Sequence, residues 1–141
     1  MEGPRLYMLT AAQVVALGVM FWLLATWKTP WNAQRYVGTA LAIIGVAGIA
    51  LARYELGRSF SIKPEAHQLV TTGIYSRIRN PIYVSGIIMA AGLILVLQRP
   101  QWWIALFVMV IGQTLRARRE ARVLEAAFGD AYRQYRRQTW F

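Results

Sequence analysis

The chain has 141 residues, of which 57% are hydrophobic, and it carries 16 Lys and Arg against 6 Asp and Glu, a formal net charge of +10. Soluble domains of this length rarely combine so apolar a composition with so much positive charge, so the two properties must be segregated along the chain. The absence of cysteine excludes disulfides, thiolate catalysis and thiolate metal sites. The single histidine, His67, argues against a zinc centre, and we expect no metal site.

Four stretches of the sequence hold no charged residue: 6–27, 36–52, 81–98 and 100–115. A helix needs roughly 20 apolar residues to cross the hydrocarbon core of a bilayer. The first stretch is long enough, and it lacks the basic leader and the small-residue cleavage site of a signal peptide. The other three are short, but aromatic residues that suit the membrane interface flank them. The sequence therefore predicts an all-α polytopic membrane protein with four transmembrane helices, in one domain.

The positions of the cations predict the orientation. With both termini on one side of the membrane, the other side keeps only Lys28, Arg35 and Arg99, which leaves 13 of the 16 cations on the side of the termini. Cytoplasmic loops carry the excess of Lys and Arg, so we expect an integral membrane protein with both termini and the central loop in the cytoplasm. Most of these cations are expected to act as topology signals and as contacts to anionic headgroups. Nucleic-acid binding is disfavoured, because no base-reading motif accompanies them.

The central cytoplasmic segment, residues 53–80, separates two predicted helical hairpins. Its Gly57, Pro64 and Gly73 predict that it does not form one continuous helix. The run from Val70 to Gly73 predicts a short extended piece that ends in a turn, where a glycine supplies a positive φ.

A helical C-terminal segment, residues 116–137, is expected after the last span. Its first part, 116–128, predicts an arginine-rich amphipathic helix. Gly129 should break this helix, and Asp130 should cap a final helical turn.

Several residues near the spans have structural explanations. Asn80 and Pro81 suit the cap and the first turn of a helix. Glu120 can pair with Arg116, four residues earlier on the same helix face. Five glycines are expected to permit close packing of helices: Gly38, Gly45, Gly48, Gly86 and Gly92.

A set of short motifs spans the chain from Leu56 to Tyr135. They read Leu56-Gly57-Arg58-Ser59-Phe60, His67-x-Leu69-Val70-Thr71-Thr72-Gly73-x-Tyr75, Arg79-Asn80-Pro81-x-Tyr83, and then Arg116, Glu120, Leu124 and Phe128-Gly129-x-x-Tyr132-x-x-Tyr135. In order and spacing this stretch resembles the isoprenylcysteine carboxyl methyltransferase family and its bacterial relatives, which are similar to the phospholipid methyltransferases. The resemblance implies an integral membrane enzyme that transfers a methyl group from S-adenosylmethionine to a lipophilic or amphiphilic acceptor at the cytoplasmic face. It is specific for the family and does not identify the acceptor, which is a carboxylate of an isoprenylcysteine-like compound or a lipid amine.

The resemblance also implies site residues. Those implied for catalysis are Arg116, Glu120, Asn80 and Tyr83. Those implied for binding the cofactor are His67, Leu69, Val70, Gly73, Tyr75, Arg79, Asn80, Pro81 and Glu120.

These assignments match the chemistry of S-adenosylmethionine. Arg79 or Arg116 can pair with its carboxylate, and Glu120 is the acid placed to meet its ammonium. Tyr75 or Tyr83 can face its sulfonium or adenine, although both also suit anchoring at the membrane interface. Glu120 is also the candidate base if the acceptor is an amine.

The chain departs from the family pattern at two positions. Asn80 stands where the family usually has histidine, and it cannot titrate near neutral pH. Ala121 stands where a second acid is common. These departures keep a second hypothesis open, a non-catalytic membrane adaptor that retains the fold. A small exporter is a weaker alternative, because the four apolar stretches hold no Asp, Glu, Lys, Arg or His.

Overall fold

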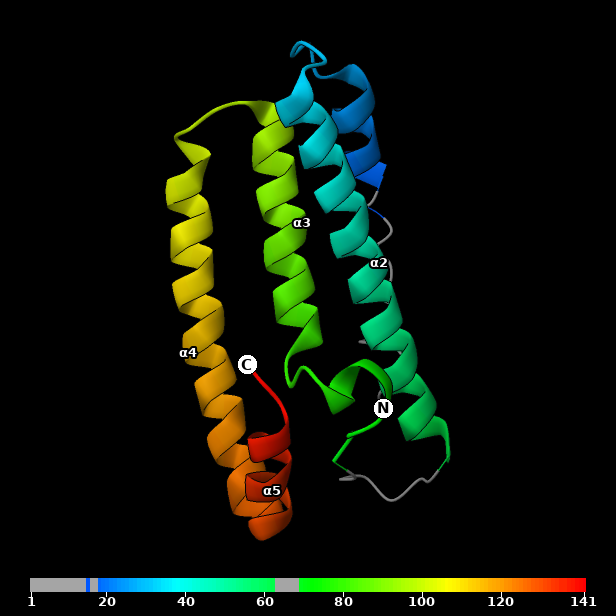
Figure 1. The fold of residues 1–141 in the computed structure, drawn as a ribbon, viewed down its shortest axis with the longest axis vertical. Helices are drawn as coiled ribbons and strands as arrows, with labels where there is room; N and C mark the ends of the chain where they lie inside the picture. The colour runs from blue at the N-terminus through cyan, green and yellow to red at the C-terminus, as the bar shows by residue number, and fades with distance from the viewer. Residues whose placement is uncertain (1–14, 16–17, 63–68) are drawn as a thin grey trace.

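A computed structural model describes residue 15 and residues 18–62 and 69–141, and this part of the chain is helical (Figure 1). A helical segment at 18–26 precedes four α-helices and one short 3-10 helix. These are α2 (Ala33–Ile62), η1 (Gly73–Ser76), α3 (Pro81–Leu97), α4 (Trp102–Phe128) and α5 (Asp130–Gln138). The prediction of an all-α fold is confirmed: the described residues form no strand, only an isolated parallel bridge between Ile78 and Trp140.

The third predicted span coincides with α3. The helix begins at Pro81, whose missing N–H costs nothing in the first turn, and Asn80 occupies the cap position without a side-chain cap hydrogen bond. The helix ends where Gln98 adopts a left-handed conformation with φ 52°.

The central segment begins differently from the prediction. The helix that contains the second span continues past Ala52 and through Gly57 to Ile62, so the interpretation of Gly57 as an interruption was wrong. One glycine in a helix interior costs only about 1 kcal/mol relative to alanine, which the flanking helix formers offset. Gly73, in contrast, does lie in a turn: its φ is +61°, and Thr72 before it is extended.

The C-terminal segment also differs from the prediction in two respects. Residues 116–128 are not a separate helix, because α4 runs without a break from the last apolar stretch to Phe128. Gly129, with φ +54°, does end it. Gly129 rather than Asp130 occupies the cap position of α5, and Asp130 is the first helical residue of a nine-residue helix.

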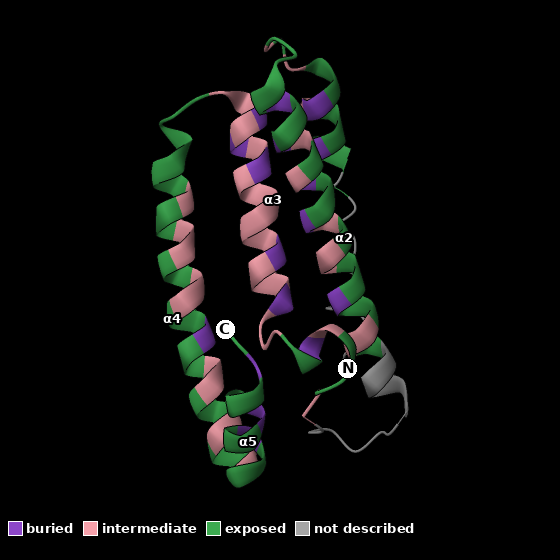
Figure 2. Cartoon of the chain, viewed as in Figure 1, coloured by how far each residue is buried: buried purple, intermediate pink, exposed green. Residues whose placement is uncertain are grey.

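The helices α2 and α3 pack closely, and buried residues concentrate along these two helices and the 18–26 segment (Figure 2). A Cβ added at Gly38 would lie 2.6 Å from the carbonyl oxygen of Gly92, and one at Gly45 would lie 2.5 Å from the backbone nitrogen of Met89. Glycine therefore lets the two backbones approach, as predicted for these positions. Gly86 is different: a Cβ there would meet only Gln113 Nε2, at 3.9 Å, so it faces a looser contact.

Two turns lie at one end of the bundle: residues 27–32, before α2, and residues 98–101, between α3 and α4. Hydrogen bonds hold these turns together. Gln98 Nε2 donates to the carbonyl oxygen of Pro30 (3.1 Å), and Thr29 Oγ1 donates to that of Val96 (2.9 Å). Arg35 is 2% exposed; it donates to the carbonyl oxygens of Leu24 and Thr29 at the end of the preceding helix. The turns are thereby held side by side (Figure 1).

Among the described residues, one helix is long and apolar enough to cross a bilayer, the 25 residues from Ala33 to Gly57; α3 is a shorter apolar helix. Only 28% of the 18-residue apolar window in that span is buried inside the fold, whereas the core helix of a soluble protein is mostly buried. Large hydrophobic side chains instead lie on the outside, such as Trp22, Ile44 and Phe107. This exterior and the long apolar helix point to membrane association.

Candidate functional site

The predicted site residues that the structure describes lie at the end of the bundle opposite the two turns. There the last turns of α2, the 3-10 helix η1, the beginning of α3, the second half of α4 and α5 come together (Figure 1). The segment Arg79-Asn80-Pro81 connects η1 to α3, so it runs through the middle of this region.

Glu120 of α4 is bonded to two side chains through the same carboxylate oxygen. Tyr83 of α3 donates its hydroxyl to Oε1 at 2.7 Å, and Arg116 donates Nε to it at 3.1 Å. The Arg116 guanidinium carbon also lies 5.8 Å from the centre of the Tyr83 ring. In the described part of the chain no hydrogen bond reaches Oε2 of Glu120. The side chains of Arg116 and Glu120 are 71% and 45% exposed, so a ligand can reach both.

The hydrogen bond from Arg116 to Glu120 raises the pKa of the guanidinium above its ordinary value. Arg116 therefore stays charged, and Glu120 has a permanent cation beside it. The three side chains form a charged cluster that joins α3 to α4.

A second acid lies at the start of η1. Glu55 of α2 accepts a hydrogen bond on Oε2 from the backbone N–H of Ile74, at 2.8 Å. A Cβ at Gly73 would collide with this carboxylate, so the turn needs glycine both for its positive φ and for its close approach to Glu55. Tyr75, 8% exposed, follows in the same turn. Burial raises the pKa of Tyr75, and Glu55 adds to the rise, whereas Arg53 lowers it.

Helix α5 holds this turn from the other side. Tyr135 is buried and donates its hydroxyl to the backbone oxygen of Tyr75 at 2.7 Å. Burial raises the pKa of Tyr135 to about 12, with a further rise from Tyr132 and a lowering by the nearby charge of Arg79. Nε of Arg79 is buried and has no hydrogen-bond partner among the described residues. The guanidinium of Arg79 therefore has an unused donor inside the site.

Residues 140 and 141 bond to the segment that precedes α3. Trp140 N–H donates to the Arg77 oxygen (3.1 Å), Arg79 N–H to the Trp140 oxygen (3.4 Å), and Asn80 N–H to the Phe141 oxygen (3.0 Å). This is the parallel bridge of Ile78 with Trp140. It supplies acceptors for backbone groups that neither η1 nor α3 can satisfy.

The structure brings Tyr83, Arg116 and Glu120 into direct contact, and it places Arg79, Asn80 and Pro81 at the beginning of α3. Leu69 and Val70 are half-buried in the irregular stretch before η1. His67 lies outside the described residues.

Three polar residues of this region carried no assignment in the sequence analysis: Glu55, Tyr135 and Gln113. Glu55 and Tyr135 bond to the backbone of η1, a contact between distant segments that spacing does not show. Gln113 of α4 faces Gly86 of α3, and its Oε1 is buried without a hydrogen-bond partner in the part of the chain that the structure describes. The signal available for Gln113 was its position, as one of the few strongly polar side chains in an apolar stretch. In the described part of the chain, no group of three or more His, Asp or Glu is placed to hold a metal ion.

The chain was compared with known proteins. The model of the family described as Phospholipid methyltransferase matches residues 33–131. No curated protein and no solved structure matches the chain significantly. The matched residues include α2, η1, α3, α4 and the beginning of α5, that is, most of the helices that build the site. The resemblance inferred from the motifs is thus confirmed, and the chain belongs to the phospholipid methyltransferase family.

Proposed function

We propose that this protein is an integral membrane methyltransferase that uses S-adenosylmethionine to methylate a lipophilic or amphiphilic acceptor at the cytoplasmic face of the membrane. The observation that carries the proposal is the cluster of Tyr83, Arg116 and Glu120 at the end of the apolar helices. Family membership supports a methyltransferase. Neither identifies the acceptor.

The donor groups of the site fit S-adenosylmethionine. The cofactor presents a carboxylate and an ammonium, which need a cation and an acid. Arg79 offers a buried Nε without a partner, and Arg116 offers an exposed guanidinium. Glu120 offers a carboxylate whose described bonds use only one of its oxygens. Glu55 is a second acid in the same region, beyond the one that the sequence analysis considered.

When bound, S-adenosylmethionine supplies a methyl group that its sulfonium already activates. The protein then has to bind the cofactor and the acceptor, align them and exclude water. The guanidinium of Arg79 or of Arg116 would pair with the cofactor's carboxylate, a partner that arginine can bind through two parallel hydrogen bonds. Tyr83 orients Glu120 by its hydrogen bond. The Glu120 carboxylate would then meet the cofactor's ammonium or, for an amine acceptor, take a proton on a carboxylate oxygen.

The lengths of the helices support a four-span arrangement with the site just outside the bilayer. With 30 residues, α2 is about 45 Å long, and with 27 residues, α4 is about 40 Å long, against a hydrocarbon core of about 30 Å. Both helices extend beyond the start of α3 at the end where the site is. The asymmetry of 13 cations to three supports a cytoplasmic position for this end and for both termini.

The experiment that tests the proposal is binding of S-adenosylhomocysteine to the purified protein in detergent, by isothermal titration calorimetry. Arg79→Ala should weaken binding by more than about tenfold, because a hydrogen bond with a charged partner contributes about 1.5–3 kcal/mol. Arg99→Ala, which removes an exposed cation from the opposite end, is the matched control and should bind normally.

Transfer of a labelled methyl group to a membrane lipid extract then completes the test and provides the acceptor for identification. A folded protein that does not bind S-adenosylhomocysteine would refute the proposal. The adaptor hypothesis would then stand, because an adaptor that lacks the chemistry has no need of the cofactor.

A further inference from the structure

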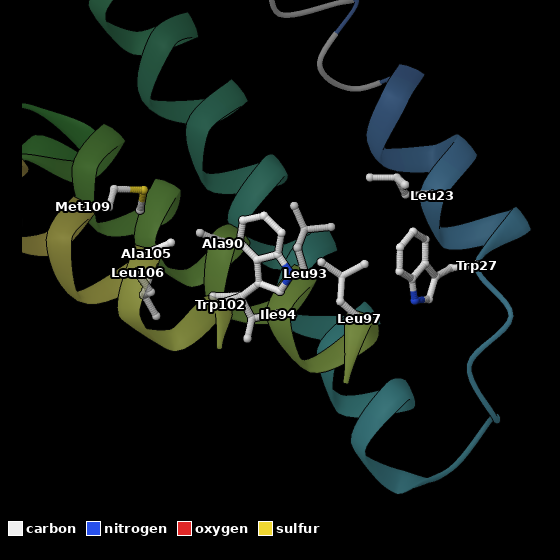
Figure 3. Close-up of a pocket in the computed structure, with 10 residues that line it drawn as sticks. All are labelled: Leu23, Trp27, Ala90, Leu93, Ile94, Leu97, Trp102, Ala105, Leu106 and Met109. Carbon is white, nitrogen blue, oxygen red and sulfur yellow. The ribbon is translucent and has the colours of Figure 1, made fainter. Parts of the chain in front are cut away.

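The contact between α3 and α4 differs in kind from the contact between α2 and α3. Glycines bring α2 and α3 into backbone contact. Between α3 and α4, in contrast, lies a pocket of about 430 Å³, at the ends of these helices nearest the turn that connects them. Its lining side chains are all apolar and come from three segments (Figure 3). Leu23 of the 18–26 segment and Trp27, directly after it, also line the pocket.

The pocket lies on the faces of α3 and α4 that lead along the helices to the candidate site. Its lining on α3 includes Leu97, Leu93 and Ala90, and its lining on α4 includes Trp102, Ala105 and Met109. The same helical spacing leads on from Ala90 to Gly86 and Tyr83, and from Met109 to Gln113 and Glu120.

Two cross-contacts confirm this register. Gln113 Nε2 lies 3.9 Å from where a Cβ of Gly86 would be, and the Tyr83 hydroxyl lies 2.7 Å from Glu120. The pocket, the Gln113 amide and the Glu120 carboxylate thus follow one another along the line where α3 faces α4, which we call the α3–α4 seam. Met109 and Glu120 are about 16 Å apart along it by helical rise.

Gln113 marks the boundary between the apolar and the charged part of this seam. Its Oε1 is buried and has no hydrogen-bond partner in the described part of the chain. Buried amide oxygens are almost always bonded, because an unpaired one keeps the cost of its lost hydration. The oxygen accepts, so the group that satisfies it must donate an N–H or O–H. An ionised carboxylate cannot do this.

We propose that the seam between α3 and α4 is the binding site of the acceptor lipid, with one hydrocarbon chain in the apolar pocket and an N–H or O–H of the polar part bonded to Gln113 Oε1. This inference rests on the proposed function, and it narrows the acceptor to an amphiphile with a hydrogen-bond donor at its head. A hydrocarbon chain fits because the pocket offers no polar side chain along its length. With the hydrocarbon chain in the pocket, the polar head of the lipid lies toward Glu120, where the charged cluster begins.

Photo-crosslinking tests the position of the chain without any turnover. The probe is a phospholipid with a primary amine headgroup and a diazirine at the end of one acyl chain, and the crosslinked residues are located by mass spectrometry. Crosslinks should fall on the α3 and α4 residues that line the pocket. Ala105→Phe fills the pocket and should abolish them. Val108→Phe adds the same ring on the 63% exposed face of the same helix and should leave them unchanged. Equal labelling of both variants would overturn the assignment of the pocket.

A second measurement tests Gln113. Gln113→Leu should weaken labelling by the primary amine probe about tenfold, the change expected for one hydrogen bond with a charged donor. It should not alter labelling by the matched quaternary ammonium lipid, which has no N–H to donate. Gly86→Ala, whose Cβ fits at 3.9 Å, is a second variant that narrows the seam and should weaken both probes. Equal loss of both probes in Gln113→Leu would refute the role of the amide.

These results separate the inference from the proposed function. Crosslinks in the pocket together with absent binding of S-adenosylhomocysteine would leave the lipid site standing and remove the methyltransferase. Normal methyl transfer in Ala105→Phe would support the methyltransferase and refute the lipid site in the pocket.

Discussion

Glu120 offers a sharp test of the charged cluster, because glutamine keeps its size and its Oε1 acceptor while removing the charge. In Glu120→Gln, the Tyr83 hydroxyl, 2.7 Å away, keeps an oxygen to donate to. What the variant loses is the attraction to a cation, both that of Arg116 and that of a bound ammonium. The substitution therefore isolates electrostatics from packing.

The expected loss of methyl transfer follows from the strength of that contact. A hydrogen bond with a charged partner contributes about 1.5–3 kcal/mol, which corresponds to a loss of about 10- to 150-fold in kcat/KM. The melting temperature should hardly change, because the pair of Glu120 with Arg116 is exposed to solvent and pairs of this kind add little stability. A large loss of activity with almost no loss of stability is the signature of a functional acid.

The assay measures labelled methyl transfer and the melting temperature on one preparation of each variant. Glu125→Gln is the matched control: it is the same change on the same helix, and Glu125 is also ion-paired, with Arg133 at 2.9 Å. The control should retain full activity. Tyr83→Phe should lower activity on its own but add little to Glu120→Gln, because Tyr83 acts by orienting the carboxylate.

Full activity in Glu120→Gln would refute this reasoning. It would mean that the chain, with Ala121 beside Glu120, transfers methyl groups without a carboxylate at this point. Equal loss in Glu125→Gln would also refute it, since the effect would then belong to the helix rather than to the cluster.

Three further outcomes are expected. Gly45→Ala should destabilise the protein by about 1–2 kcal/mol, because overpacking against the α3 backbone outweighs the gain in helix propensity. Gly112→Ala is the control and should not destabilise it, since no described atom lies within 4 Å of the added Cβ. Intrinsic tryptophan fluorescence during heating measures both. Because the folded-state pKa of Tyr135 is raised to about 12 from 10.0, its contribution to stability is complete below pH 10 and lost as pH rises toward 12, so alkaline unfolding should be shallower in Tyr135→Phe. In the four-span arrangement, Asn32→Cys, the only thiol in the chain, should react with an impermeant maleimide from outside intact cells; protection from outside would overturn the topology.

The sequence predicted those elements whose boundaries depend on local chemistry. Proline in a first turn and the left-handed turn after the helix define α3 within one residue of the predicted span. The break at Gly129 is of the same kind, since a residue with positive φ ends a helix wherever it occurs. Helix ends without such a residue were missed. At Gly57 a modest propensity cost was given too much weight, and at residue 116 a change of polarity was interpreted as a change of element.

The site was predictable only in its local part. Arg116 and Glu120 are four residues apart on one helix, so their pairing follows from spacing. The bonds of Glu55 to η1, of Tyr135 to η1 and of residue 140 to residue 77 join segments far apart in the chain. These contacts depend on how the helices are arranged, and no periodicity in the sequence encodes them.

The contacts of Tyr135 and Trp140 with the segment before α3 have a consequence for the order of biosynthesis. The backbone oxygen of Tyr75 accepts a hydrogen bond from the Tyr135 hydroxyl, and Tyr135 is synthesised 60 residues later. At about 5–20 residues per second, a ribosome takes about 3–12 s to make that interval. During this time the helices made earlier can fold and pack while the segment before α3 still lacks its last partners. The site is therefore completed only when residues 135–140 have been made.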